Sequence, residues 1–174
     1  MQRNVSIIRD LDGSRIVVIN DVIFKGRQSI EWVEVEKYLK QFVGTCYDII
    51  ETDDMIYIGS DLPDEFTGSN YTKKLKGALA KAKANAAQGL PEMIEIATEK
   101  RFKENLKEKH NTNAEYGWYR YNTKFAIPVY NDKQELERFN VFGAVLIIRH
   151  SHDGRLYLYD LLNIKKETGK PLEP

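Results

Sequence analysis

The chain has 174 residues, of which 42% are apolar and 30% are charged, and its 26 basic residues balance its 26 acidic ones. This length suits one ordinary domain, or one compact domain with a small appendage, and disfavours two independent domains. The zero net charge gives no overall signature of a polyanion binder, and no apolar run reaches the ~20 residues of a membrane span. A single cysteine, Cys46, excludes an internal disulfide. Because the amino terminus carries no recognisable secretory signal, we expect a soluble, cytoplasmic protein without a membrane partner.

The first part of the chain predicts a small β-rich subdomain with one helix. VSIIRDLDGSRIVVIN indicates two short strands around an Asp-Gly turn. Ser29 can cap a helix through IEWVEVEKYLKQFV, which Gly44 ends. CYDIIETDDMIYIGS then gives two further apolar runs about a Thr-Asp-Asp turn.

Two helices are expected in the next part of the chain. YTKKLKGALAKAKANAAQG is rich in alanine and lysine, and Gly89 with Pro91 provides a stop signal. Pro91 at a first helical position, with acidic residues early and lysines late, predicts a second helix through PEMIEIATEKRFKENLKEKH.

From Gly117 to about Glu167 the sequence predicts three antiparallel strands, GWYRYNTKFAIPV, FNVFGAVLIIRH and RLYLYDLLNIKK. Helices followed by such a meander make an α+β fold in which two helices cover one face of a sheet of at least three strands. We therefore predict an N-terminal α+β subdomain over residues 1–65 and an α+β domain over residues 66–174.

Strand periodicity divides the aromatic residues of the first meander strand between two faces. Tyr119 and Tyr121 belong to the apolar set that is expected to pack under the helices. The opposite face is predicted to present Trp118, Arg120, Lys124, Tyr157, Tyr159 and Lys165. Aromatic rings stack on exposed bases and cations hold a phosphate backbone, so this mixture suits a nucleic-acid surface. The alternative is that the two tyrosines of the third strand are buried against the N-terminal subdomain while the cations are merely solvated.

Five lysines crowd the first of the two predicted helices: Lys73, Lys74, Lys76, Lys81 and Lys83. A phosphate-bearing partner would explain them. They are also explained as a solvated face that keeps an alanine-rich helix soluble.

The three histidines form no familiar metal or catalytic motif. His110 ends the second predicted helix, where a structural cap is as good an explanation as an acid or base. His150 and His152 lie two residues apart, but no third ligand stands at a familiar spacing, so no metal or other cofactor is expected. The sequence also lacks a phosphate-binding loop and a Gly-x-Ser-x-Gly motif.

The chain from about Tyr71 to Glu173 resembles a family of protein domains that mobile genetic elements encode. KGALAKAKANAAQGLPEMIEIATEKRFKENLKEKH, GWYRYNTKFAIPVY and NVFGAVLIIRHSHDGRLYLYDLLNIKKET are similar to large polyvalent protein-associated domains of bacterial phages and conjugative elements. Those domains are thought to relate to the fold of barnase, EndoU and RelE-like ribonucleases, in which the open face of an antiparallel sheet holds the active site. The resemblance implies that residues 66–174 form a barnase/RelE-like domain that cleaves or binds RNA without a metal.

Metal-independent cleavage needs a base, an acid and cations that stabilise the charge on phosphorus. Under the resemblance, the base or acid is His110 or His150, the phosphate clamps are Arg120 and Arg149, and the stacking or proton-donating group is Tyr157 or Tyr159. No glutamate or histidine stands unambiguously on the open face. The alternative is therefore a non-catalytic module that binds a protein partner encoded by the same element.

Overall fold

The structure is a computed structural model that describes residues 3–26, 29–103 and 114–167. Its strands are β1 (Val5–Arg9), β2 (Arg15–Ile19), β3 (Cys46–Asp48), β4 (Met55–Tyr57), β5 (Thr98–Lys103), β6 (Trp118–Tyr130), β7 (Leu136–His150) and β8 (Leu156–Lys166). Its helices are α1 (Trp32–Leu39), α2 (Leu62–Gly68), α3 (Asn70–Lys74), α4 (Gly77–Ala86) and α5 (Leu90–Glu95), with 3-10 turns η1 (Lys40–Phe42) and η2 (Ala87–Gly89).

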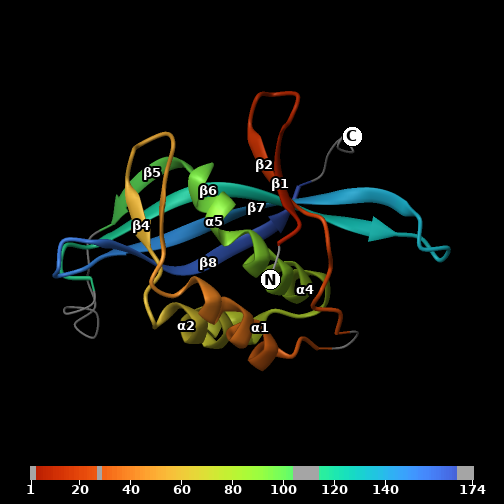
Figure 1. Ribbon diagram of the computed structural model, residues 1–174, viewed down its shortest axis with the longest axis horizontal. Helices are drawn as coiled ribbons and strands as arrows, with labels where there is room; N and C mark the ends of the chain where they lie inside the picture. Colours follow the sequence, from red (N-terminus) through yellow and green to blue (C-terminus); the bar gives the residue numbers. More distant parts are fainter. Residues whose placement is uncertain (1–2, 27–28, 104–113, 168–174) are drawn as a thin grey trace.

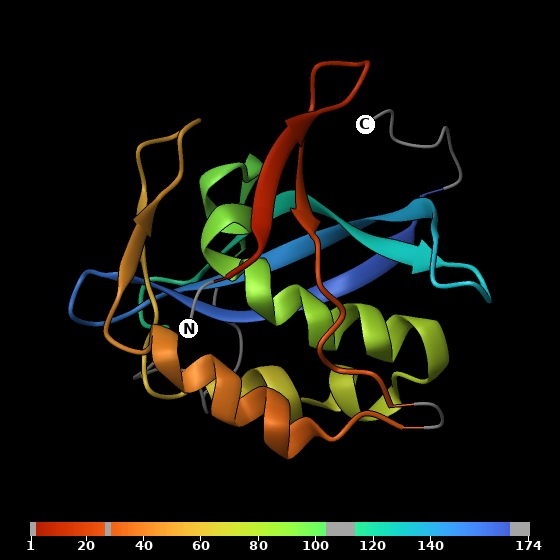
Figure 2. The ribbon, with the colours of Figure 1, turned by 45° about the vertical axis from the view of Figure 1, so that its right-hand side comes forward.

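The described strands form one mixed sheet, and the protein is α+β as predicted. Strand order is β1-β2-β6-β7-β8-β4-β3, and β5 also pairs with β6. Helices α4 and α5 lie over the long strands, with α1 and α2 along the β8 side (Figure 1). The β1–β2 and β3–β4 hairpins both project from the body away from α1 and α2 (Figure 2). Helices α4 and α5 therefore cover one face of the long strands.

The N-terminal strands extend the same sheet at both sides. β1 and β2 form the predicted hairpin, and β2 continues into the sheet by pairing in parallel with β6, with Val17 beside Phe125. β3 and β4 form the second predicted hairpin, and β4 pairs in parallel with β8. Strands from both sides of residue 65, the predicted boundary between two units, thus belong to one sheet.

The alanine- and lysine-rich segment forms two helices where the sequence predicts one. α3 begins at a cap in which Ser69 Oγ accepts a hydrogen bond from the backbone N–H of Thr72. Leu75 is extended, and Gly77 begins α4 at a φ of +59°. The separate α4 packs against β6 and β8, and its alanines let it approach the sheet closely.

The prediction of a long second helix is wrong. α5 ends at Glu95, and Thr98–Lys103 form strand β5, which pairs antiparallel with the edge of β6. The unpaired edge of the first half of β6 offers backbone partners to this segment, which overrides its helical charge pattern. His110 lies outside the described residues.

The predicted meander β6–β7–β8 is confirmed, with β7 in the centre. Tyr121 pairs with Leu146 and Phe125 with Phe142, and these side chains are buried under the helices. In β8 the register shifts near Asp160, so that Leu161 joins the core where strict alternation predicts Leu162.

Candidate functional site

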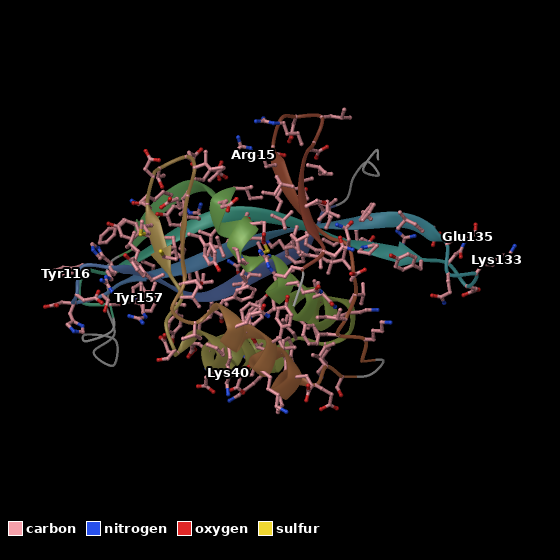
Figure 3. The ribbon with its side chains drawn as sticks, in the orientation of Figure 1. Arg15, Lys40, Tyr116, Lys133, Glu135 and Tyr157 are labelled. Atoms are coloured by element: carbon pink, nitrogen blue, oxygen red, sulfur yellow. The ribbon has the colours of Figure 1, made fainter. Side chains whose placement is uncertain are left out.

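Three side chains singled out in the sequence stand in one row across the sheet. Trp118 on β6 lies opposite Arg149 on β7, which lies opposite Tyr157 on β8. Ile148 and Leu158, the next residues of β7 and β8, belong to the core under the helices. Strand alternation therefore places the row on the other face. Figure 3 shows Tyr157 near one end of the long strands.

Two more aromatic rings join this row. Tyr159 meets Trp118 edge to face, with ring centroids 4.9 Å apart. Tyr57 of β4 extends the row beyond Tyr157, at 5.8 Å between centroids. All four rings are partly exposed. Burial, followed by the interaction with Glu65, raises the pKa of Tyr159, so its hydroxyl stays protonated at neutral pH.

Arg149 is held by the protein itself, contrary to its expected role as an open phosphate clamp. Its side chain lies over the ring of Tyr157, with 4.2 Å from the guanidinium carbon to the ring centroid. Its Nη2 lies 3.3 Å from Asp61 Oδ1, at the start of α2. Only 8% of Arg149 is exposed. The residue therefore orders this end of the sheet rather than presenting a cation to a ligand.

Arg120 follows Trp118 on the same face and is the more available cation. Among the described residues, none forms a hydrogen bond or an ion pair with its guanidinium. Directly opposite it across the β5–β6 pair stands Arg101. Arg101 donates hydrogen bonds to the carbonyl of Glu99 at 2.8 Å and to Asn122 Oδ1 at 3.0 Å. Arg101 and Arg120 are therefore directly opposite each other on β5 and β6, and among the described residues no acidic side chain forms an ion pair with either guanidinium.

Sequence reasoning missed Arg101 because it lies inside the segment predicted as a helix. No alternation of apolar and polar residues in this segment, TEKRFK, marks it as a strand. Phe102 packs on Tyr119 of the helix-facing set, with ring centroids 5.4 Å apart. Arg101 consequently points to the opposite face.

His150 lies on the helix-facing side of the sheet, opposite to the face that carries Arg120. Its ring contacts Tyr116 and Tyr119, at centroid distances of 5.1 Å and 5.9 Å. Since Tyr119 belongs to the helix-facing set, the structure does not bring together Arg120 and His150, which is one of the two predicted acid or base residues.

The hydroxyl of Tyr157 already has an acceptor. It donates a hydrogen bond to Asp153 Oδ2 at 2.6 Å, and this bond raises the pKa of Tyr157. Its proton is therefore held more firmly than in a free tyrosine, which favours a stacking role over proton donation.

The five predicted lysines do not form one surface. Lys73, Lys74, Lys76 and Lys81 are exposed. They come from α3, from α4 and from the residues between these helices, not from the strands that carry Trp118 and Arg120. Lys124 does share the face of Arg120, and its Nζ lies 3.6 Å from Glu167 Oε2.

Lys83 differs most from expectation, because it is fully buried. Its Nζ lies 2.7 Å from Asp160 Oδ1 and 2.6 Å from Thr72 Oγ1. The ammonium also lies 4.6 Å from the ring centroid of Phe66. Burial lowers the pKa of Lys83 and raises the pKa of Asp160, and the attraction between the two groups opposes both shifts. Enclosed in this way, Lys83 cannot meet a nucleic acid.

Comparisons of this chain with protein-family models, with curated proteins and with solved structures give no match. Within the described ranges, no helix is long and apolar enough to cross a membrane. In that same part of the chain, His, Cys, Asp and Glu do not gather in groups of three that could hold a metal ion. The site consists of two arginines that are opposite each other on paired strands, Arg101 and Arg120, beside a row of aromatic rings.

Proposed function

We propose that this protein binds single-stranded RNA on the sheet face that carries Trp118, Arg120 and Tyr157. The observation that carries the proposal is the position of Arg101 directly opposite Arg120 beside Trp118. Like charges at such positions destabilise a strand pair. A phosphate bound between the two guanidinium groups offsets their repulsion through charge-assisted hydrogen bonds. Neighbouring aromatic rings supply stacking surfaces for the bases, as proteins that bind single strands require.

The arrangement favours binding over cleavage among the described residues. A ribonuclease needs its base and its phosphate-binding cations around one phosphate. Here His150 and Arg120 lie on opposite faces, and Arg149 is engaged by Asp61 and Tyr157. Metal-independent cleavage and the association with a mobile element stay predictions of the resemblance.

The alternative of a protein-binding module also stays a prediction. An exposed, contiguous apolar patch would favour it. The exposed large apolar side chains belong to several different elements, with examples in Ile7, Val33, Met55, Phe102 and Leu136. Single exposed apolar residues are normal on protein surfaces and give no reason to prefer this reading.

The proposal is tested by the salt dependence of RNA binding. Fluorescence anisotropy would measure the affinity for an RNA of about eight nucleotides, a length within the usual site size of single-strand binders. Arg120→Gln and Arg101→Gln should each weaken binding and reduce the slope of log K against log salt by about 0.7, as expected for one lost phosphate contact on a single strand. Lys133→Gln is the matched control.

Lys133 lies at the β6–β7 turn, at the opposite end of the long strands from Tyr157 (Figure 3). Its substitution should leave both the affinity and the slope unchanged. The proposal is overturned if the wild-type protein binds no RNA at low salt, or if the two arginine variants behave like Lys133→Gln.

A further inference from the structure

An open groove of about 1130 Å³ adjoins the face of Arg120. Asn122 and Lys124 follow Arg120 on the same face of β6, and both line the groove. Other lining residues are Gly143, Lys165, Arg15 and Glu99. An RNA strand that lies on Trp118 and Arg120 would therefore enter this groove if the RNA continued along β6. From Trp118 to Lys124 the path is on the order of 20 Å, which accommodates several nucleotides.

Basic and acidic side chains line different parts of the groove, except that Glu167 also lines it beside Lys124, with 3.6 Å between Oε2 and Nζ. The turn of the β1–β2 hairpin contributes Arg9 and Arg15, close to the point where β2 pairs with Phe125 of β6. Lys124 and Lys165 continue this basic side across the sheet. Figure 3 shows Arg15 on the projecting hairpin. One border of the groove is thus positively charged.

Acidic side chains lie at the start of β5. Glu51 and Glu99 line the groove there, where Thr98 pairs with Asn122 of β6. Glu51 Oε2 accepts a hydrogen bond from the backbone N–H of Glu99 at 3.1 Å. Asn122 Nδ2 donates to Glu99 Oε2, and Asn122 Oδ1 accepts from Arg101 at 3.0 Å. These contacts fix the acidic border in place and connect it to Arg101, which is opposite Arg120 on the paired strand.

The backbone of Glu99 supports the same conclusion. Its φ is +56°, a sparsely populated region for a residue with a side chain. Such a conformation persists only where the surroundings hold it, and it is found preferentially at binding sites. The backbone at Glu99 is therefore held by its surroundings, and the hydrogen bond from Asn122 Nδ2 holds its carboxylate.

A single nucleic-acid strand has two chemically different edges, and the groove has two matching borders. Phosphates suit the side of Arg15, Lys124 and Lys165, because cations attract them. The base edges then face Glu51 and Glu99, whose ionised carboxylates only accept hydrogen bonds. The exocyclic amino group of cytosine donates to a carboxylate, as in base recognition by Glu and Asp. Uracil has a carbonyl oxygen at that position, so it would place one acceptor against another.

Building on the proposed RNA binding, we infer that this groove selects cytosine over uracil through the carboxylates of Glu51 and Glu99. The two bases share one ring size, so their stacking on Trp118 and the phosphate contacts of their strands are alike. Discrimination between them therefore reports on the acidic border alone.

The test compares dissociation constants for oligocytidine and oligouridine of about eight nucleotides. The wild-type protein should prefer oligocytidine by about tenfold, within the range of a good base contact. Glu99→Gln keeps the size of the side chain and an acceptor for Asn122, but its amide also donates. We expect this variant to bind both oligonucleotides within about twofold of each other, since an amide serves either base. Glu135→Gln, at the distant β6–β7 turn, should keep the wild-type preference (Figure 3).

The outcomes separate the selection of bases from RNA binding itself. If both oligonucleotides bind equally well and Arg120→Gln weakens both, the base selection is wrong while RNA binding stands. If the preference for cytosine survives in Glu99→Gln, the acidic border does not read the base and the inference is also overturned. If the wild-type protein binds neither oligonucleotide, the proposed function itself fails. Circular dichroism and thermal unfolding would establish that each variant is folded.

Discussion

Lys83 and Asp160 form an enclosed ion pair between α4 and β8. The exposed fractions of their side chains are 0% and 2%. Thr72 Oγ1 accepts a further hydrogen bond from the ammonium, and the backbone N–H of Leu161 donates one to Asp160 at 2.7 Å. Desolvation makes a buried pair a weak source of stability, but removing one partner leaves a buried charge without compensation.

Lys83→Met should therefore be strongly destabilising. The loss of the ammonium isolates the carboxylate of Asp160, and we expect a decrease of about 3–5 kcal/mol in the free energy of unfolding. Urea denaturation would measure it. Lys81→Met is the matched control on the same helix, and because Lys81 is exposed its effect should stay within about 0.5 kcal/mol. The double variant Lys83→Met/Asp160→Asn should recover part of the lost free energy of unfolding. If Lys83→Met and Lys81→Met destabilise the protein equally, the Lys83–Asp160 ion pair does not have the stabilising role assigned to it.

The Lys83→Met variant should also change the dependence of stability on pH. Burial raises the pKa of Asp160 even beside Lys83, and removing the cation raises it further. The folded state then binds the proton more tightly than the unfolded state does, so stability falls as pH rises from the unfolded pKa toward the folded pKa. The deficit of the variant relative to wild type should consequently be larger near pH 8 than near pH 5. Urea titrations at the two values would measure it, and a deficit that grows on acidification would refute the assignment.

At the scale of elements, the break between α3 and α4 determines which face of α4 is buried. Gly77 opens α4 with a φ of +59°, and nothing would contact a Cβ placed there. The local composition favours one continuous helix, yet the extended Leu75 and Lys76 redirect the chain so that Lys83 points inward.

Gly77→Ala should destabilise the protein although alanine is the better helix former. An L-residue in the left-handed region costs roughly 1–2 kcal/mol. Gly68→Ala is the control, since Gly68 ends α2 without a left-handed φ and its added Cβ would meet only Asp64 Oδ1 at 4.0 Å. Thermal unfolding should show a lower midpoint for Gly77→Ala and an unchanged or higher one for Gly68→Ala. If the thermal midpoint rises in both variants, the left-handed conformation of Gly77 between α3 and α4 is not required for the fold.

β5 illustrates how a distant partner overrides a local pattern. Lys100 lies 2.9 Å from Asp54 Oδ2 and 4.5 Å from the ring centroid of Tyr119. Burial by itself would raise the pKa of Asp54, but the hydrogen bonds from Tyr121 and Lys100 lower it. Contacts with the β3–β4 hairpin and with β6 thus stabilise a strand in a segment whose charge order is typical of a helix.

At the scale of the whole molecule, the sheet separates two sets of candidate residues. One face carries Trp118 and Arg120, and the other carries Tyr119 and His150. The N-terminal hairpin belongs to the same sheet and places Arg15 beside the groove. The proposed RNA-binding surface therefore combines residues from the first and the last parts of the chain.

His150→Ala should leave RNA affinity within about twofold of wild type, because its side chain is on the face opposite the bound strand. Arg120→Gln should weaken the same RNA in the same titration. Incubation of RNA with the wild-type protein and a metal chelator provides the complementary measurement. Cleavage that is lost in both His150→Ala and Arg120→Ala would contradict the separation of the two faces and favour a ribonuclease.

The sequence by itself determined the features that depend on neighbours along the chain. An Asp-Gly turn between β-rich runs predicts the β1–β2 hairpin, and strand alternation predicts that Tyr121 is buried while Trp118 and Arg120 share the other face. Both signals are local, because turns involve a few residues and side chains alternate along any strand.

Only the tertiary structure decided the features that join distant segments. The pairing of β5 with β6 puts Arg101 opposite Arg120, and the burial of α4 turns Lys83 from an expected surface charge into the partner of Asp160. The groove likewise combines Arg15, Glu99 and Lys165. Hydrogen bonding along an open strand edge and the packing of helices on a sheet stabilise these arrangements, and neither leaves a periodic trace in the local sequence.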